Sequence, residues 1–397
     1  MKIAAIDSFH VRGTPSQTYW GARTWGSNGG LELDSYPPAA RRRYIYSATI
    51  DAVLVRVRTT DGLEGWGEAK APVGGRATKA IIDELLAPIA MDSSLDEISR
   101  TWDRMYAGMR VRGHDSGFWL EAIAGVDIAL WDAWARSLSR PLCTLLGGRY
   151  RTRLPIYASG IPAAGPGSGD EGQARVRAEA ERLVADGYEA VKVAIGASPF
   201  SDVASVRTVR EVFGDAASVF ADAAGQYDYY DALQVGRRLS DIGVGFYEMP
   251  LPPEDLDGYA RLARQLDIPI ALDSLATRHR ALEFLRAGAL HVLQPDVCRA
   301  GGITETMRIA ALADAFGARA TPHVSIGSPV HVAASVHCAA AMPNFAVMEY
   351  WVGTNPLAVL APDALRPEGS SIDVPSNIGL GVTVDGDAVA ALAGRGS

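Results

Sequence analysis

The chain has 397 residues, of which 48% are hydrophobic and 21% are charged, a balance that suits a globular protein with a large core. Its formal net charge is −8, and its densest basic run is only Arg41-Arg42-Arg43. A nucleic-acid or anionic membrane surface needs a larger basic face, so neither kind of partner is expected.

Three cysteines, Cys143, Cys298 and Cys338, lie far apart and form no CxxC or Cys/His zinc pattern. Such a sparse, odd set fits reduced thiols in a cytoplasm. The first residues lack the long apolar segment of a signal peptide, and no apolar run reaches the roughly 20 residues of a membrane span. We therefore expect a cytoplasmic protein.

The N-terminal part of the chain is predicted to combine strands and helices. Residues 3–11 and 52–59 alternate apolar and polar side chains, as half-buried strands do. Asp61-Gly62 then predicts a hairpin turn after the second strand. Residues 77–140 carry apolar side chains at helical spacing, so this region is predicted to be helical.

After residue 150 short apolar strands alternate with helical segments, which is the pattern of a parallel α/β barrel or of a doubly wound sheet. The predicted strands are residues 154–159, 190–196, 218–223, 246–250, 269–273, 292–296, 319–324 and 346–350. The predicted helices are residues 171–186, 203–213, 232–242, 256–265, 281–287 and 304–316. The tail is rich in proline and glycine and has one strand-like segment, residues 381–384.

Polar residues at the strand ends favour the barrel. They recur at intervals of 23 to 30 residues, the length of one β/α unit. A doubly wound sheet would spread them along a line, whereas a barrel brings them into one ring at its C-terminal mouth. These residues are Lys192, Asp222, Glu248, Asp273, Asp296, His323 and Glu349.

Asp222, Glu248 and Asp273 come from three consecutive strand ends and would repel one another in one pocket unless a cation neutralised them. Oxygen ligands of this kind suit a hard divalent ion, Mg²⁺ or Mn²⁺. The alternative for each carboxylate is an ordinary role in capping the next helix or pairing with an arginine.

His323 follows Asp296 by one predicted strand, so the two are candidates for a histidine–aspartate pair that acts as a general base. The alternative is a structural histidine, the role expected for His331 and His337. Lys192 is isolated within an apolar strand and could hold a substrate carboxylate. The alternatives are that its ammonium group only reaches out to solvent or only pairs with a barrel carboxylate.

The sequence resembles the enolase superfamily, in the mandelate racemase and acid-sugar dehydratase branch, over nearly its whole length. The resemblance implies an α+β capping domain over a (β/α)7β, TIM-like barrel. It also implies Mg²⁺ and abstraction of the α-proton of a carboxylate substrate to give an enediolate. The matching stretches are Gly65-Trp66-Gly67-Glu68, Asp127-Ile128-Ala129-Leu130-Trp131-Asp132, Leu145-Leu146-Gly147-Gly148, Tyr247-Glu248-Met249-Pro250-Leu251, Gln294-Pro295-Asp296, Ala300-Gly301-Gly302-Ile303 and Pro322-His323.

By this resemblance Asp222 and Glu248 match the first two metal ligands, and Asp273 is the candidate for the third. Many relatives have Gly-Glu or Asp-Glu where this chain has Asp273-Ser274. His323 and Asp296 match the family's catalytic pair, and the resemblance implies that Glu349 hydrogen-bonds the substrate carboxylate or the enediolate.

Two positions depart from the family pattern. The second barrel strand commonly carries Lys-x-Lys, but here it reads Lys192-Val193-Ala194. The third commonly reads Asp-x-Asn, but here it is Asp222-Ala223-Ala224. Racemisation needs a base on each face of the enediolate, so the loss of the second lysine favours a one-base reaction such as dehydration.

Substrate contacts are expected from Tyr157 and from a long irregular stretch, residues 13–46. A loop of this length without regular structure is often functional, and this one carries Trp20 and Arg23. Arg23 would suit a carboxylate or the hydroxyls of a sugar.

The predicted organisation is α/β, with an N-terminal α+β capping domain at residues 1–148, a barrel at 149–352 and a tail at 353–397 that packs on the capping domain. The predicted activity is dehydration of a sugar acid, a small-molecule carboxylate, by His323 with Asp296, Lys192 and Glu349. The alternatives are epimerisation or racemisation, lactone cycloisomerisation, and a descendant that only binds a ligand. The resemblance also implies a homo-oligomer.

Overall fold

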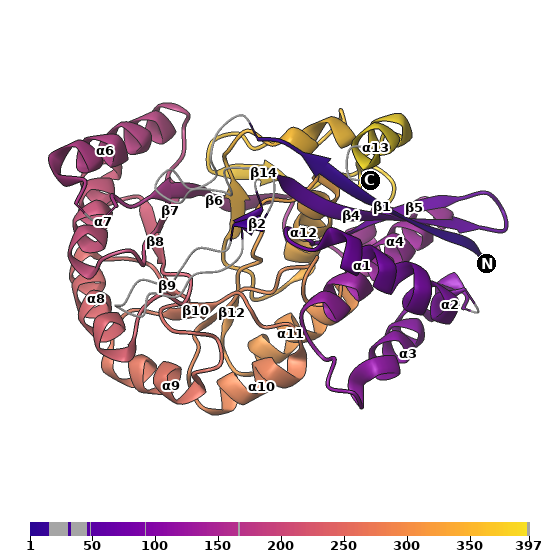
Figure 1. Cartoon of the computed structure of the whole chain (residues 1–397), viewed down its shortest axis with the longest axis horizontal. Helices are drawn as coiled ribbons and strands as arrows, with labels where there is room; N and C mark the ends of the chain where they lie inside the picture. Colours follow the sequence, from indigo (N-terminus) through magenta and orange to yellow (C-terminus); the bar gives the residue numbers. More distant parts are fainter. Residues whose placement is uncertain (16–30, 33–45, 48, 92, 166, 395–397) are drawn as a thin grey trace.

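The computed structural model describes residues 1–15, 31–32, 46–47, 49–91, 93–165 and 167–394. Trp20, Arg23 and most of the stretch 13–46 lie outside the described residues. Figure 1 shows a barrel surrounded by helices beside a smaller sheet that carries its own helices.

Eight parallel strands follow one another around the barrel in chain order, and the last strand returns to pair with the first. A bridge between Ala320 and Phe345 brings the seventh strand next to the eighth. The predicted barrel is therefore confirmed. The strands are β6 (Arg153–Pro162), β7 (Ala190–Ala194), β8 (Ser218–Asp222), β9 (Tyr247–Glu248), β10 (Ile270–Leu272), β11 (Val292–Leu293), β12 (Arg319–Ala320) and β13 (Met348–Trp351).

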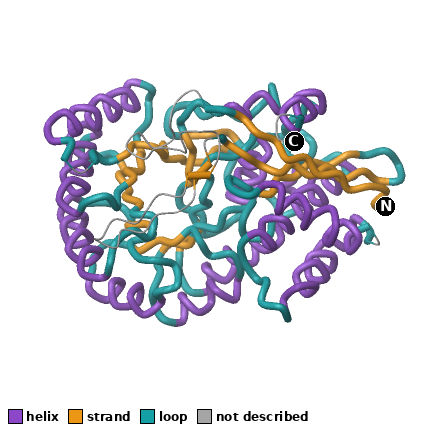
Figure 2. Tube along the Cα trace, viewed as in Figure 1, coloured by secondary structure: helices purple, strands orange, loops and turns teal. Residues whose placement is uncertain are grey.

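One helix follows each of the first seven strands, and together these helices form the outer layer of the barrel (Figure 2). Several begin at a side chain that accepts a backbone N–H of the first turn, as Asp228, Asp255, Thr277 and Ser328 do. The helices are α6 (Gly169–Ala185), α7 (Pro199–Phe213), α8 (Tyr229–Ile242), α9 (Leu256–Gln265), α10 (Arg278–Arg286), α11 (Ile303–Ala315) and α12 (Pro329–Ala341).

The N-terminal sheet is antiparallel, with β4 between β1 and β5. A Cβ on Gly65 or Gly67 would lie within 2.4 Å of backbone atoms of α4, so these two glycines let the helix pack directly on β5. The three strands are β1 (Ile3–Gly13), β4 (Ile50–Thr59) and β5 (Glu64–Ala69). A separate pair is formed by β2 (Leu31–Glu32) and β3 (Tyr46–Ser47). The helical segments are α1 (Gly75–Ile81), η1 (Ile82–Leu86), α2 (Ala87–Ala90), η2 (Leu95–Glu97), α3 (Ile98–Arg110), α4 (Phe118–Ser137) and α5 (Leu142–Leu145).

The tail contributes to both parts of the molecule. Helix α13 (Gly386–Ala393) places Val389 and Leu392 in one apolar cluster with Val11 of β1, and η3 (Pro356–Leu360) joins the same cluster. The only tail strand in the described residues is β14 (Ser371–Asp373), which pairs antiparallel with β6. The predicted strand at 381–384 is wrong, because Val382 is buried by that cluster rather than by pairing with a neighbouring strand.

None of the helices within the described ranges has the length and apolar character needed to cross a membrane. Cys143, Cys298 and Cys338 are buried and free.

Candidate active site

Five of the seven predicted residues lie at or just after the C-terminal ends of their barrel strands, and two lie within their strands. Lys192 and Glu349 are within β7 and β13, and Asp222 and Glu248 end β8 and β9. The other three follow their strands by one to three residues. They are Asp273 after β10, Asp296 after β11 and His323 after β12.

Lys192 is the cation of this group. Its Nζ lies 2.8 Å from Glu349 Oε1, 2.9 Å from Glu248 Oε2 and 3.6 Å from Asp222 Oδ2, and the residue is only 2% exposed. Burial lowers the pKa of a lysine, but these carboxylates outweigh it and hold the pKa of Lys192 well above its usual range. Lys192 therefore remains charged across the physiological pH range.

The carboxylates differ in how well they are compensated. Burial would raise the pKa of Glu349, but Lys192 and His323 lower it to about 2. Burial raises the pKa of Glu248 well above its usual range, since Lys192 only partly offsets the nearby Asp222 and Glu349. Burial likewise raises the pKa of Asp222. The pocket therefore holds more negative charge than one lysine neutralises.

A divalent cation fits this donor set. Glu248 Oε1 and Asp273 Oδ1 are buried and have no hydrogen-bond partner among the described residues, so each offers a free oxygen. Two groups within the described residues have ligand atoms within 4.8 Å of one another: Glu68, Cys298 and His331, and, in this pocket, Glu248, Asp273 and His323, with His323 in place of the predicted Asp222. The carboxylates are the better match to Mg²⁺, because it prefers oxygen ligands. Asp222 lies beside Glu248 in the sheet register.

His323 faces the same pocket. Its Nδ1 lies 2.9 Å from Asp296 Oδ2, and its Nε2 lies 3.5 Å from Glu349 Oε2 and 3.6 Å from Asp273 Oδ2. A neutral ring that donates Nδ1–H to Asp296 leaves the Nε2 lone pair directed toward the carboxylates. This is the arrangement that a general base requires.

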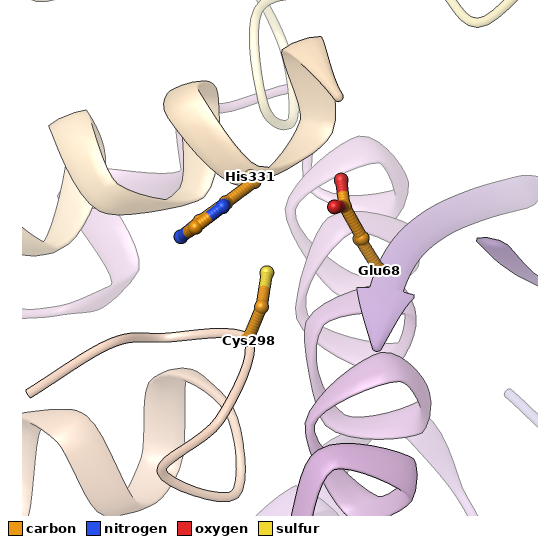
Figure 3. A group of neighbouring side chains, drawn as sticks. All are labelled: Glu68, Cys298 and His331. Carbon is orange, nitrogen blue, oxygen red and sulfur yellow. The ribbon is translucent and has the colours of Figure 1, made fainter. Parts of the chain in front are cut away.

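Asp296 has more partners than expected. Besides His323, Lys70 Nζ donates to its Oδ2 at 2.9 Å, the backbone N–H of Cys298 donates to its Oδ1, and His331 Nε2 lies 3.0 Å from the same Oδ1. His331 was expected only as a structural histidine, but α12 turns its ring toward Asp296, at the back of the pair. Figure 3 shows it beside Cys298 and Glu68.

Tyr157 lies under the lysine. It is fully buried, its ring packs against Phe220 and Phe246, and the Lys192 Nζ is 5.5 Å from the ring centre. Its hydroxyl has no hydrogen-bond partner within the described ranges. The aromatic cluster therefore forms an apolar floor beneath the charged residues.

The two positions that depart from the family pattern flank this pocket. Ala194 pairs with Asp222 in the register of β7 and β8 and is almost fully buried. Ala224 has a φ of 48°, in the left-handed region, and its N–H donates to Asp222 Oδ1 at 2.8 Å. Ala224 thus keeps a backbone conformation that asparagine adopts more readily than alanine.

Lys70 and Arg299 are residues that the sequence analysis did not single out. Arg299 lies 3.7 Å from Asp273 Oδ2 and 3.7 Å from Glu121 Oε1, whose pKa burial raises to about 7. The available signal for Lys70 was its place between Ala69 and Ala71, as an isolated charge at the end of an apolar strand.

Two family models match the chain. Residues 45–147 match the model described as "Mandelate racemase / muconate lactonizing enzyme, N-terminal domain", and residues 175–388 match "Enolase C-terminal domain-like". Among curated proteins, the chain is 32% identical over 338 residues to arabinonate dehydratase of Saccharolobus solfataricus, covering 84% of this chain and 88% of that protein. It is also 32% identical over 348 residues to D-galactarolactone cycloisomerase of Agrobacterium fabrum, covering 85% and 90%.

A solved structure of a racemase from Streptomyces coelicolor with bound magnesium is similar with a TM-score of 0.82 and 26% identity, covering 98% of this chain and 99% of that one. The sequence motifs, the barrel, the strand-end residues and these matches agree. The chain belongs to the enolase superfamily of enzymes, in its mandelate racemase and muconate lactonizing enzyme branch.

Proposed function

We propose that this chain is a Mg²⁺-dependent dehydratase of a sugar acid. The observation that carries the proposal is the placement of His323, whose Nδ1 is held by Asp296 while its Nε2 faces Glu349 and Asp273. A relative that is 32% identical is an arabinonate dehydratase, which supports this reaction class.

The proposed cation ligands are Asp222, Glu248 and Asp273, with Mn²⁺ as the other ion that suits oxygen donors. The unpartnered oxygens of Glu248 and Asp273 and the excess negative charge of the pocket support this set. When bound, such an ion supplies positive charge for the anion that forms as the α-proton leaves.

Each of the proposed catalytic residues then has its own role. Lys192 binds the substrate carboxylate, and His323 Nε2 removes the α-proton while Asp296 stabilises the imidazolium through Nδ1–H. The same imidazolium proton is returned to the β-hydroxyl, the C–O bond breaks, and water leaves. The enol product becomes a 2-oxo-3-deoxy acid by tautomerisation, so atoms and protons balance. Tyr157 is proposed to support Lys192 from below, and Trp20 and Arg23 to contact the substrate.

Symmetric racemisation is disfavoured because Ala194 carries no base at the position where relatives commonly have a second lysine. Cycloisomerisation of a lactone is the second candidate, since it also needs only one base. The 32% identity to D-galactarolactone cycloisomerase favours it specifically.

A screen of aldonic and aldaric acids and their lactones with Mg²⁺ tests the proposal, with α-proton exchange in D₂O and product mass as readouts. Loss of one water per turnover is expected, whereas a product of unchanged mass would replace the dehydratase with the isomerase. No exchange and no turnover with any acid would overturn the proposal in favour of a protein that only binds its ligand.

A further inference from the structure

Lys70 does not belong to the barrel, yet it contacts the centre of the proposed catalytic pair. It follows β5 of the N-terminal sheet, is only 5% exposed, and donates from Nζ to Asp296 Oδ2 at 2.9 Å. The same carboxylate oxygen faces His323 Nδ1. Ser325, two residues beyond His323, also contacts Lys70 Nζ through its hydroxyl.

The backbone closes this contact into a ring. The N–H of Lys70 donates to the carbonyl of Cys298 at 3.1 Å, and the N–H of Cys298 donates to Asp296 Oδ1 at 2.9 Å. Lys70 is therefore linked to Asp296 in two ways: its backbone N–H is linked through Cys298, and its ammonium group donates to the carboxylate directly. Neither oxygen of the carboxylate can rotate without breaking one of these bonds.

A residue of β5 two positions before Lys70 also contacts the loop that follows His323. Glu68 of β5 accepts the backbone N–H of Ser328 at 3.0 and 3.1 Å, and Ser328 caps α12, which carries His331. Figure 3 shows Glu68 on its strand facing Cys298 and His331. Glu68 and Lys70 thus contact the barrel at Asp296 and at two points within the segment from His323 to His331, Ser325 and Ser328.

We infer that Lys70 is a positioning residue that holds the Asp296 carboxylate, and through it the His323 ring, in the reactive orientation. The catalytic part of this inference rests on the proposed function, whereas the positioning part does not. The proposed proton transfer uses His323 itself, whereas Lys70 is an ion-pair partner of Asp296 that takes no part in that transfer. Asp296 is only 1% exposed. Without Lys70 it would be a buried anion whose neighbouring positive charge, on His323, came and went during each catalytic cycle.

The electrostatics of Asp296 agree with this geometry. Burial alone would raise the pKa of Asp296, yet it lies well below its usual range, and Lys70 contributes most to the lowering, followed by His331 and His323. Removal of Lys70 leaves the backbone N–H of Cys298 and the two histidines as partners of the carboxylate, and each histidine is charged only when protonated. Among the described residues Oδ2 then keeps only His323, so the carboxylate is held less firmly beside the ring.

The rival explanation is a purely structural ion pair between the N-terminal sheet and the barrel. The two explanations differ for a double-mutant cycle. If Lys70 acts through Asp296, the Lys70→Met substitution reduces kcat by about 10- to 100-fold in the wild type. It then causes no further loss in Asp296→Asn, because the partner that it positions is already altered. A purely structural pair instead predicts that Lys70→Met lowers the free energy of unfolding and leaves kcat of the folded enzyme unchanged in both backgrounds, because direct contact couples the two residues in stability whatever their role.

The closing experiment uses two readouts on Lys70→Met, Lys70→Gln and Lys70→Arg, with Lys79→Met as the matched control. Lys79 lies on α1 of the same region and pairs with Asp83 at the surface. The first readout is the low-field proton resonance of His323 Nδ1–H, identified by its loss in His323→Asn, which needs no substrate. The second is kcat and KM for any acid that the protein turns over.

We expect the resonance to be lost or shifted in Lys70→Met and Lys70→Gln and retained in Lys70→Arg and Lys79→Met, with kcat reduced and KM changed less than about twofold. An unchanged resonance in Lys70→Met overturns the inference, whether or not a substrate is found. Multiplying losses in the double mutant also overturn it. If no acid is turned over but the resonance responds as expected, the positioning role stands and only the proposed function fails.

Discussion

Lys192 Nζ and Glu349 Oε1 lie 2.8 Å apart inside the barrel, and both residues are almost fully buried. The strands that carry them, β7 and β13, both pair with β6, so the contact spans one intervening strand. The pair sits over the ring of Tyr157, in a part of the pocket where carboxylates outnumber cations. A buried pair of this kind costs more to break than it contributes when intact.

The Lys192→Met substitution is therefore expected to lower the free energy of unfolding by about 3–5 kcal/mol in the presence of EDTA, because Glu248 and Glu349 lose their common cation. Added Mg²⁺ should recover more stability in this variant than in the wild type, since it supplies the missing charge. Denaturant unfolding with and without Mg²⁺ measures both effects, and Lys2→Met, an exposed lysine, is the control. Equal stability of Lys192→Met and the wild type in EDTA would contradict the charge balance described above.

The His323→Asn substitution should reduce α-proton exchange by about 10²- to 10⁴-fold, the usual contribution of a general base. Mg²⁺ affinity should stay close to that of the wild type, because the proposed ligands Asp222, Glu248 and Asp273 remain. Deuterium exchange and Mg²⁺ titration test the two statements separately. His114→Asn, at an exposed position, should change neither. Full exchange activity in His323→Asn would show that another residue is the base.

The sequence predicted the barrel and its strand-end residues because each signal was local. Lys192, Glu248 and His323 are isolated polar residues in or just after short apolar strands. They belong to a series of seven that recurs at the spacing of one β/α unit, and parallel strands bring such positions together in one barrel. No knowledge of packing between distant segments was needed for that step.

The partners of Asp296 could not be predicted in this way. Lys70 reaches it from another sheet, 226 positions away in the chain, and His331 reaches it from a helix whose rotation the sequence does not show. The predicted strand in the tail was wrong for a related reason. Residues 381–384 alternate in polarity as a strand does, but Val382 is apolar because it packs in the cluster that includes residues of β1 and α13.

The Ala224→Asn substitution is expected to stabilise the protein by about 0.5–1 kcal/mol, because asparagine tolerates the left-handed conformation that costs alanine about 1–2 kcal/mol. The φ of 48° at this position is the basis of the expectation. Denaturant unfolding measures it, and Ala224→Val, a β-branched residue, should be destabilising. A loss of stability in Ala224→Asn would mean that the side chain has no room beside Asp222.

His337 should make stability depend on pH in a direction opposite to that of the raised carboxylates. It is buried between Cys143, whose N–H donates to Nδ1, and the carbonyl of Leu380, which accepts from Nε2, and burial lowers its pKa from 6.5 to about 4. The unfolded chain therefore binds a proton that the folded chain excludes between these values. The stability from this residue is complete above pH 6.5 and is lost as pH falls toward 4.

Between pH 7 and pH 5 this term amounts to about 2 kcal/mol. The comparison that isolates it is urea unfolding of the wild type and His337→Gln at both pH values, since all other titrating groups are shared. The glutamine variant should be less stable at pH 7 but should lose about 2 kcal/mol less on acidification. Parallel losses in the two proteins would show that the His337 ring is protonated in the folded state, and that the contacts to Cys143 and Leu380 do not fix its neutral form.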